Sequence, residues 1–179
     1  APALQAGGQG FDPPSLHKEK DPSEMAGLFS FPAHCFPYCY FMAQVADLVK
    51  LFYEQLWNQK NFEIANEILD EQINFRGSLG SAMLGRVRVC EYVKDVTTAL
   101  ADYHCDIQEL VVEGEKASAK VLFNGIHVGE FMDYEPTQKE VSWLGTAFFE
   151  SSNGVLTNIW VLGDLVGLRS KLEQNRLDS

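Results

Sequence analysis

The chain has 179 residues, and its 25 acidic against 14 basic side chains give a formal net charge of −11. Nucleic-acid binding depends on clustered Lys and Arg, so this balance argues against a nucleic-acid-binding protein. Hydrophobic residues make up 46% of the chain and aromatic residues 12%, which is enough for a packed core and excludes wholesale disorder. The four cysteines are too few and too scattered for a disulfide scaffold.

The first 40 residues differ in composition from the rest, since six of the seven prolines lie before residue 38. We therefore predict an extended, proline-rich arm at residues 1–40 and a folded domain at residues 41–179. The arm also carries apolar side chains such as Phe29 and Phe31, and an extended apolar segment is ordered only against a surface. That surface is its own body, a second copy or another protein. We expect contacts outside its own body, in a homo-oligomer or a larger protein complex.

An uncharged stretch at residues 28–46 approaches the length of a membrane-spanning helix. Pro32 and Pro37 interrupt it, so we expect it not to span a membrane. The chain starts Ala-Pro-Ala-Leu, without Met, which is compatible with a processed terminus. The sequence leaves both the cytoplasm and an organelle such as a plastid open as the location.

The remaining chain shows helical and then strand periodicity. Apolar side chains recur at helical spacing in four segments, at residues 40–58, 61–69, 87–103 and 165–174. Alternating or β-branched segments bounded by turn residues predict strands at residues 73–75, 106–113, 116–125, 126–131, 140–150 and 155–162. Asn61 is expected to cap the second helix. Helices followed by a run of antiparallel strands are typical of an α+β domain.

The strongest local signal is an apolar strand, 156–162, that ends in Gly163-Asp164 directly before a helix. Asp164 has two interpretations. It is either the cap of the helix, accepting backbone N–H bonds, or a carboxylate at the mouth of an apolar cavity. In such a cavity desolvation would raise its pKa into the range useful for proton transfer. From the residues alone, the pattern favours the cap.

No cofactor or metal site is expected. The sequence contains no glycine-rich phosphate loop, serine nucleophile elbow or His-Glu-x-x-His zinc motif. His34, Cys35 and Cys39 have the chemistry of metal ligands, but Pro37 breaks the helix that would align them. Cysteines in amphipathic or apolar stretches, such as Cys105, are typically buried and inert.

Several separated segments occur together in one protein family. They read Leu51-Phe-Tyr-Glu-Gln-Leu-Trp-Asn-Gln, Phe75-Arg-Gly-Ser-Leu-Gly, Tyr103-His-Cys-Asp-Ile, Gly125-Ile-His-Val-Gly-Glu-Phe-Met, Pro136-Thr, Val141-Ser-Trp and Ile159-Trp-Val-Leu-Gly-Asp. In their order and spacing, residues 41–172 resemble the SnoaL-like polyketide cyclases, often described as predicted ester cyclases. The family lies within the nuclear-transport-factor-2-like superfamily. The resemblance implies a cone, in which a curved antiparallel sheet wraps around three helices and a pocket opens at one end.

The resemblance also implies a function. Family cyclases close a polyketide ring by intramolecular aldol condensation without metal or cofactor, which needs a base for a C–H proton and an acid for the new alkoxide. The resemblance assigns this role to Asp164 and thereby favours the pocket carboxylate over the helix cap, although one residue can do both. His127 matches the His of the family's Gly-x-His-x-Gly segment. It would polarise a carbonyl group or orient Asp164, or else be a hydrogen-bonded core histidine.

Further candidates for the pocket come from the same segments. Trp143 and Trp160 lie on neighbouring predicted strands, where they would wall the pocket or belong to the core. Arg76 would bind a substrate carboxylate or pair with an acidic neighbour. Tyr103 and Asn74 complete the set.

Three residues depart from the family's pattern. Asp133 and Gln138 stand where the family commonly has Gly, and Asn158 stands where it often has His or Glu. We expect a cofactor-free cyclase or isomerase that acts on a small apolar, polyketide-like carbonyl compound. The alternative is a non-catalytic subunit or binding module docked in a larger assembly through residues 1–40, since the fold alone does not decide function.

Overall fold

The computed structural model describes residues 45–178 of the chain. The chain divides into two units, Ala1–His34 and Cys35–Ser179, and every element below belongs to the second. The predicted arm, its boundary at residue 40 and most of the uncharged stretch lie outside the described residues. Among the residues that are described, no helix is both long enough and apolar enough to cross a membrane.

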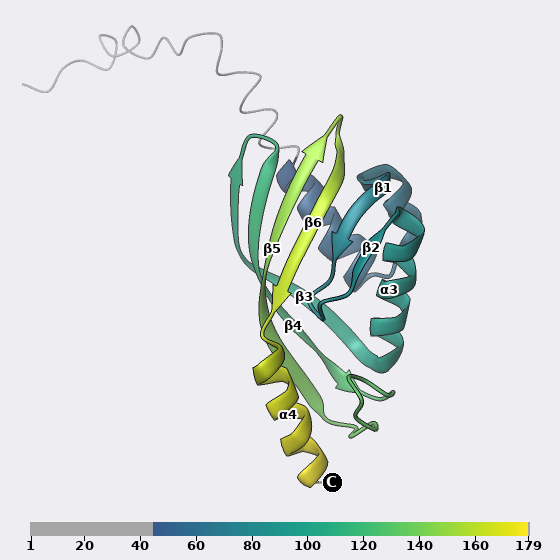
Figure 1. Ribbon diagram of the computed structural model, residues 1–179, viewed down its shortest axis with the longest axis vertical. Helices are drawn as coiled ribbons and strands as arrows, with labels where there is room; N and C mark the ends of the chain where they lie inside the picture. The colour runs from purple at the N-terminus through teal and green to yellow at the C-terminus, as the bar shows by residue number, and fades with distance from the viewer. Residues whose placement is uncertain (1–44, 179) are drawn as a thin grey trace, which may run out of the picture. The chain divides into compact units, whose positions relative to one another are not determined.

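Six strands form one curved sheet with the order β2-β1-β6-β5-β4-β3 (Figure 1). Their bounds are β1 (Leu69–Arg76), β2 (Ala82–Leu84), β3 (Leu100–Glu113), β4 (Lys116–His127), β5 (Glu140–Ser152) and β6 (Val155–Gly163). β3, β4, β5 and β6 pair antiparallel, but β1 pairs with β6 in parallel. The sheet is therefore mixed, since β1 and β6 are far apart in the sequence and are not joined by a hairpin.

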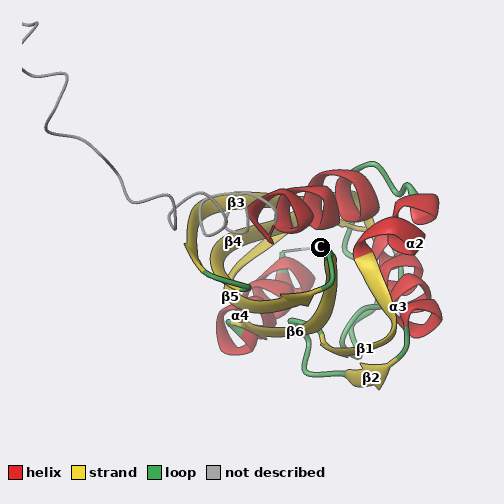
Figure 2. Cartoon of the chain, turned by 90° about the horizontal axis from the view of Figure 1, so that it is seen from above, coloured by secondary structure: helices red, strands yellow, loops and turns green. Residues whose placement is uncertain are grey.

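The first helix and α3 (Arg86–Ala99) pack on the inner face of this sheet (Figure 2). Residues 45–51 are α-helical and continue into the π-helix η2 (Phe52–Asn58). The short helices η3 (Phe62–Ile64) and α2 (Ala65–Ile68) follow, then α3 (Arg86–Ala99), and α4 (Leu165–Leu177) comes after β6. Figure 2 shows the strands arranged in an arc, with the first helix and α3 on its inner side. The predicted α+β cone is confirmed.

Several predicted element boundaries are wrong. The helix predicted to end at residue 103 ends at Ala99, because the following residues pair with the end of β4, Leu100 opposite His127. The strands predicted at residues 116–125 and 126–131 are replaced by a single strand, β4, which ends at His127. The predicted cap Asn61 makes no side-chain capping bond.

The core is rich in aromatic side chains. Buried and exposed residues alternate along β4 and β5, so that each strand sends every second side chain inward. Fully burying one large apolar side chain contributes about 1.5–3 kcal/mol, so this inner face supplies most of the stabilisation of the fold. On the opposite, outer face of β5 and β6, four large apolar side chains remain exposed, namely Leu144, Phe148, Trp160 and Leu162.

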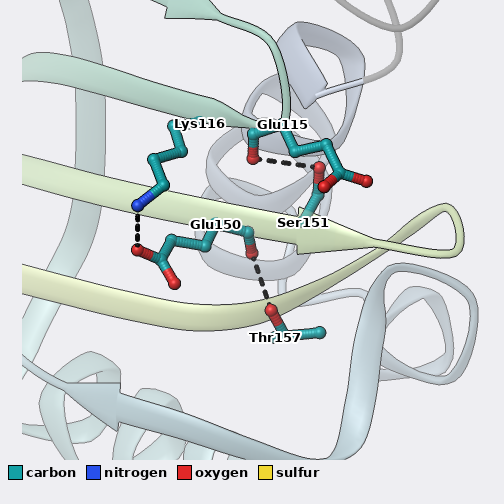
Figure 3. A network of polar contacts seen from close by, with 5 residues as sticks. All are labelled: Glu115, Lys116, Glu150, Ser151 and Thr157. Carbon is teal, nitrogen blue, oxygen red and sulfur yellow. Dashed lines mark hydrogen bonds and ion pairs between the residues drawn. The ribbon is translucent and has the colours of Figure 1, made fainter.

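A polar network joins the ends of the two hairpins (Figure 3). The Lys116 Nζ lies 2.8 Å from the Glu150 Oε1, between β4 and β5. The Ser151 Oγ donates to the Glu115 carbonyl at 3.2 Å, and the Thr157 Oγ1 donates to the Glu150 carbonyl at 3.3 Å. The ion pair is exposed and contributes little. The hydrogen bonds fix the strands at the point where the β5–β6 register shifts, between Glu150 and Ser151.

Candidate functional site

The interior of the cone is the candidate functional site. A cavity of about 10 Å³ remains there, which is at the lower limit for one water molecule. Its lining is mostly aromatic and comes from the first helix, from the loop after β1 and from four strands. The lining residues are Phe52, Tyr53, Trp57, Phe75, Ser78, Tyr103, Phe123 and Val161.

The π-helix η2 places three of these aromatic side chains, Phe52, Tyr53 and Trp57, in the lining. A π-helix is rare and occurs often at functional sites, because its wider turn changes which side chains share a face. Asn58, its last residue, holds the helix on β3. The Asn58 Nδ2 donates to the Cys105 carbonyl at 3.0 Å, and the Cys105 amide donates to the Asn58 Oδ1 at 2.8 Å.

An unbroken series of ring contacts extends from the cavity to His127. The ring centroids of Trp57 and Tyr103 lie 5.5 Å apart, and those of Tyr103 and Trp143 lie 6.1 Å apart. Phe131 then contacts Trp143 at 6.1 Å and His127 at 6.2 Å. Aromatic pairs at these distances each contribute about 0.5–1.5 kcal/mol beyond the area that they bury. Three predicted site residues, His127, Tyr103 and Trp143, thus belong to one interior cluster.

Four buried polar atoms in this interior have no hydrogen-bond partner. Within the described chain they are the Tyr53 Oη, Trp57 Nε1, His127 Nε2 and Trp143 Nε1. An unpaired buried polar atom costs about 1–3 kcal/mol, so four of them in one region need an explanation. Both indole nitrogens are donors only, and the tyrosine hydroxyl also donates. The interior is therefore suited to a ligand with acceptor oxygens, such as carbonyl groups, or to an ordered water in the cavity.

His127 is fully buried, with 0% of its surface exposed. Its Nδ1 lies 3.2 Å from the Thr137 Oγ1. Burial lowers the pKa of His127, and the carbonyl groups of Gly129 and Tyr134 near the ring oppose this shift only in part. The imidazole is therefore neutral at neutral pH, with its Nδ1 held by Thr137 and its Nε2 near these carbonyl groups but without a well-formed hydrogen bond. A neutral imidazole in this state can accept or pass on a proton, depending on the tautomer.

Asp164, the second predicted acid–base residue, lies at the start of α4. Its side chain is exposed, and its Oδ1 accepts a hydrogen bond from the Gly167 amide at 2.9 Å, as the N-cap of α4. Asp164 does not line the interior cavity. The residue before it does reach the interior wall, since a Cβ built on Gly163 would lie 3.2 Å from the Trp143 Cδ1. Asp164 therefore makes the capping contact, and its neighbour Gly163 lies against the wall of the interior.

Three predicted pocket residues, Trp160, Arg76 and Asn74, lie on the outer face of the sheet. The reason is strand alternation, since Phe75 of β1 points inward and its two neighbours point outward. The Arg76 guanidinium lies 5.0 Å from the centre of the Trp160 ring and also donates to the Val161 carbonyl. These three residues therefore lie on the outer face and not in the pocket. Arg76 contacts the Trp160 ring and not a neighbouring carboxylate.

Two interior residues, Tyr53 and Trp57, were not among the predicted site residues. Their signal was their spacing of four residues inside the Leu51–Gln59 segment that carries the family resemblance. Cys105 is buried, as expected, and burial raises the pKa of its thiol, which keeps it protonated and unreactive. Among the described residues, no group of three or more His, Cys, Asp or Glu side chains is placed to hold a metal ion.

Comparison with solved structures finds the same fold in bacterial proteins. TsrD from Streptomyces laurentii is 22% identical, with a TM-score of 0.66, and the match covers 73% of this chain and 95% of that chain. A SnoaL-like polyketide cyclase from Agrobacterium tumefaciens is 16% identical, with a TM-score of 0.60 and coverages of 72% and 97%. An epoxide hydrolase of M. tuberculosis is 13% identical, with a TM-score of 0.61 and coverages of 76% and 94%. At these identities the likeness shows the fold alone.

Sequence comparison gives the family. A search of the curated proteins found no match. The profile described as SnoaL-like polyketide cyclase matches residues 47–172, which include η2, the whole sheet and most of α4. On this match the chain belongs to the SnoaL-like polyketide cyclase family, within the nuclear-transport-factor-2-like superfamily.

Proposed function

We propose that the chain is a cofactor-free cyclase-type enzyme and that its substrate, a small and largely apolar carbonyl compound, reacts in the interior of the cone. The observation that carries the proposal is the set of four unpaired polar atoms in an otherwise aromatic interior. The Tyr53, Trp57 and Trp143 donors would pair with the oxygens of a carbonyl compound, the unprotonated His127 Nε2 would face a C–H group next to the carbonyl, and the apolar parts would pack against the rings. Membership of the family supports the same reaction class.

In the proposed reaction His127 handles the proton. Its neutral imidazole removes a proton from the carbon next to a carbonyl group. The resulting enolate then attacks a second carbonyl group of the same molecule, and the new alkoxide takes a proton back. The donors of Trp57, Trp143 and Tyr53 would stabilise the enolate and alkoxide oxygens. Asp164 is the second candidate for the acid and base, because only its Oδ1 is engaged by the cap.

An activity assay with linear β-polyketo esters would test this proposal, with the cyclised product followed by its absorbance and mass. His127→Gln is expected to lower kcat by about 10²–10⁴-fold, the usual contribution of a general acid or base. Asp164→Asn keeps the cap and removes the carboxylate, so it separates the second candidate from the first. Trp160→Phe on the outer face is the control. Full activity in both the His127 and the Asp164 variants would contradict acid–base catalysis by this site.

A second function has its own support. The interior is nearly filled by its own side chains, whereas Phe148 and Trp160 are exposed on the outer face at 51% and 39%. A non-catalytic subunit docked in a larger assembly through residues 1–40 would have these features without any turnover. Substituting Phe29 and Phe31 by Asp would then dissociate the assembly, as measured by light scattering of the purified complex. An assembly of unchanged mass would contradict docking through this segment.

A further inference from the structure

The loop between β4 and β5, which we call the gate loop (residues 128–138), carries an aromatic side chain into the interior. Phe131 is only 6% exposed and packs against the rings of His127 and Trp143. Trp143 is the next member of the series of rings that leads to the cavity lining. Phe131 is thus the part of this loop that fills the interior beside two of its unpaired polar atoms.

Both ends of the gate loop are held by backbone hydrogen bonds. The His127 amide donates to the Lys139 carbonyl, and the Gln138 amide donates to the His127 carbonyl, each at 2.9 Å. At the start of the loop, the amides of Val128 and Gly129 both donate to the Ala99 carbonyl, each at 3.0 Å. These bonds fasten the two ends of the loop to β4, β5 and the end of α3.

In the middle of the gate loop, the backbone–backbone hydrogen bonds stay within the loop. Phe131 and Tyr134 exchange two backbone hydrogen bonds of 3.0 Å around a tight turn. Within the described chain, no backbone–backbone hydrogen bond joins residues 130–137 to another element, and the Tyr134 carbonyl lies near the His127 ring. The turn that carries Phe131 can therefore move as a unit about the two fastened ends.

The closed loop is also strained. Met132, Asp133 and Gln138 have φ values of 54°, 69° and 58°, in the left-handed region that side chains with a Cβ disfavour. Two of these residues stand where the family commonly has Gly, which adopts this conformation without strain. The chain thus keeps a glycine-type backbone with other side chains, which destabilises the closed loop relative to open conformations.

One side-chain contact opposes that strain. Thr137 is 9% exposed, and its Oγ1 lies 3.2 Å from the His127 Nδ1. This contact links the far end of the gate loop to the buried imidazole. Breaking it would release the loop and would free the second nitrogen of His127 at the same time.

We propose that the gate loop controls access to the interior, with Phe131 as its plug and the contact between Thr137 and His127 as its latch. The proposal rests on the proposed function in that it assumes a ligand in the interior. It explains how an interior with only about 10 Å³ of free volume accepts a ligand. The ligand takes the space that Phe131 vacates and meets the Nε2 of His127 and the Nε1 of Trp143.

Acrylamide quenching of Trp143 measures this motion without any ligand. Trp57→Phe and Trp160→Phe in the full chain leave Trp143 as its sole tryptophan. Phe131→Ala, Phe131→Leu and Thr137→Val are expected to raise the quenching constant several-fold, because they remove the plug or the latch. Asp133→Gly with Gln138→Gly is expected to lower it, because the two glycines relieve strain in the closed loop. Lys60→Gly, at another positive φ of 56° outside the loop, is the matched control.

Ligand entry is the second measurement, with xanthone as the probe, a flat aromatic ketone whose binding is followed by stopped-flow fluorescence. The double glycine variant should bind it about tenfold more slowly than the parent, and Phe131→Leu should bind it faster. If xanthone binds at one rate in all variants, the gate is wrong and the interior site stands. If xanthone never binds but quenching follows the loop variants, the gate stands and the proposed function loses its support. Equal quenching in every variant overturns the gate, whatever xanthone does.

Discussion

The two faces of the same sheet use similar side chains in opposite ways. On β5 and β6, Trp143 and Phe149 face the interior and are 3% and 1% exposed, whereas Phe148 and Trp160 face outward and are 51% and 39% exposed. Inside, the rings pack against one another and leave donor atoms unpaired. Outside, the Trp160 ring lies tilted against Phe148, with 6.0 Å between the ring centroids, and Arg76 lies over it in contact with water. Residue type therefore does not distinguish a site residue from a surface residue here, but the face of the strand does.

The difference between the two faces is tested most directly by truncating one tryptophan on each face. Trp143→Ala removes a buried ring and leaves a cavity, for which a loss of about 3–5 kcal/mol in the free energy of unfolding is expected. Trp160→Ala removes a partly exposed ring and a cation–π contact, for which about 1 kcal/mol or less is expected. Urea unfolding of both variants followed by circular dichroism measures the difference. Equal losses would mean that the outer face is covered by another surface in solution.

The attachment of the first helix gives the next largest effect. Asn58→Ala removes both hydrogen bonds to Cys105, which hold η2 on β3, and a loss of about 2 kcal/mol is expected because both are partly buried. Asn61→Ala is the matched control, since Asn61 makes only an exposed side-chain contact of 3.5 Å with Gln55. Urea unfolding would again report the losses. A similar cost for both variants would contradict the anchoring role of Asn58.

Much of the fold could be predicted from the sequence, because its signals are local. The helical spacing of apolar residues at 87–99 and the alternation of buried and exposed residues along β5 each indicate one buried face. The parallel pairing of β1 with β6 could not be predicted this way, since it depends on a contact between Phe75 and Ile159 that no local pattern records. The π-helical turn of η2 was not predicted either, because the apolar spacing of this segment also fits an ordinary α-helix.

For the candidate site, the sequence indicates the segments involved but not the face on which each side chain lies. Family motifs mark which segments approach the interior, but neighbouring residues of a strand point to opposite faces. The structure places Tyr103 and Trp143 in the interior, whereas Trp160 and Arg76 lie on the outer face. Asp133 and Gln138 stand where the family commonly has Gly, and both have positive φ values. The chain thus differs from the family in these side chains but keeps a backbone conformation that Gly favours.

Asp164 offers a smaller effect that separates its two interpretations. Asp164→Ala removes the cap of α4 and is expected to cost about 1 kcal/mol, whereas Asp164→Asn should retain nearly all of the stability, because Asn caps as well as Asp. Thermal unfolding of the two variants measures this difference. If Asp164→Asn is as destabilised as Asp164→Ala, the carboxylate charge does more than cap the helix, which would favour a role toward the interior.

The smallest expected effect concerns His127 and the dependence of stability on pH. Its pKa in the folded chain is lowered, chiefly by burial, so protonation favours the unfolded state, in which the ordinary value is about 6.5. Stability from this group is therefore complete above about pH 6.5 and decreases as the pH falls toward the lowered value. An outer-face histidine open to water would show no such loss, so the measurement tests the contrast between the two faces directly.

The experiment compares the wild type with His127→Gln by urea unfolding at several values between pH 5 and pH 8. Carboxylates that titrate at the lower end are common to both proteins, so the difference in slope isolates the imidazole. The wild type is expected to lose more stability than the variant as the pH falls, and the difference should disappear above neutral pH. Parallel curves would mean that His127 is as well solvated in the folded chain as in the unfolded one. The interior would then be open to water near the gate loop, and the inner face beside Phe131 would be solvated like the outer face.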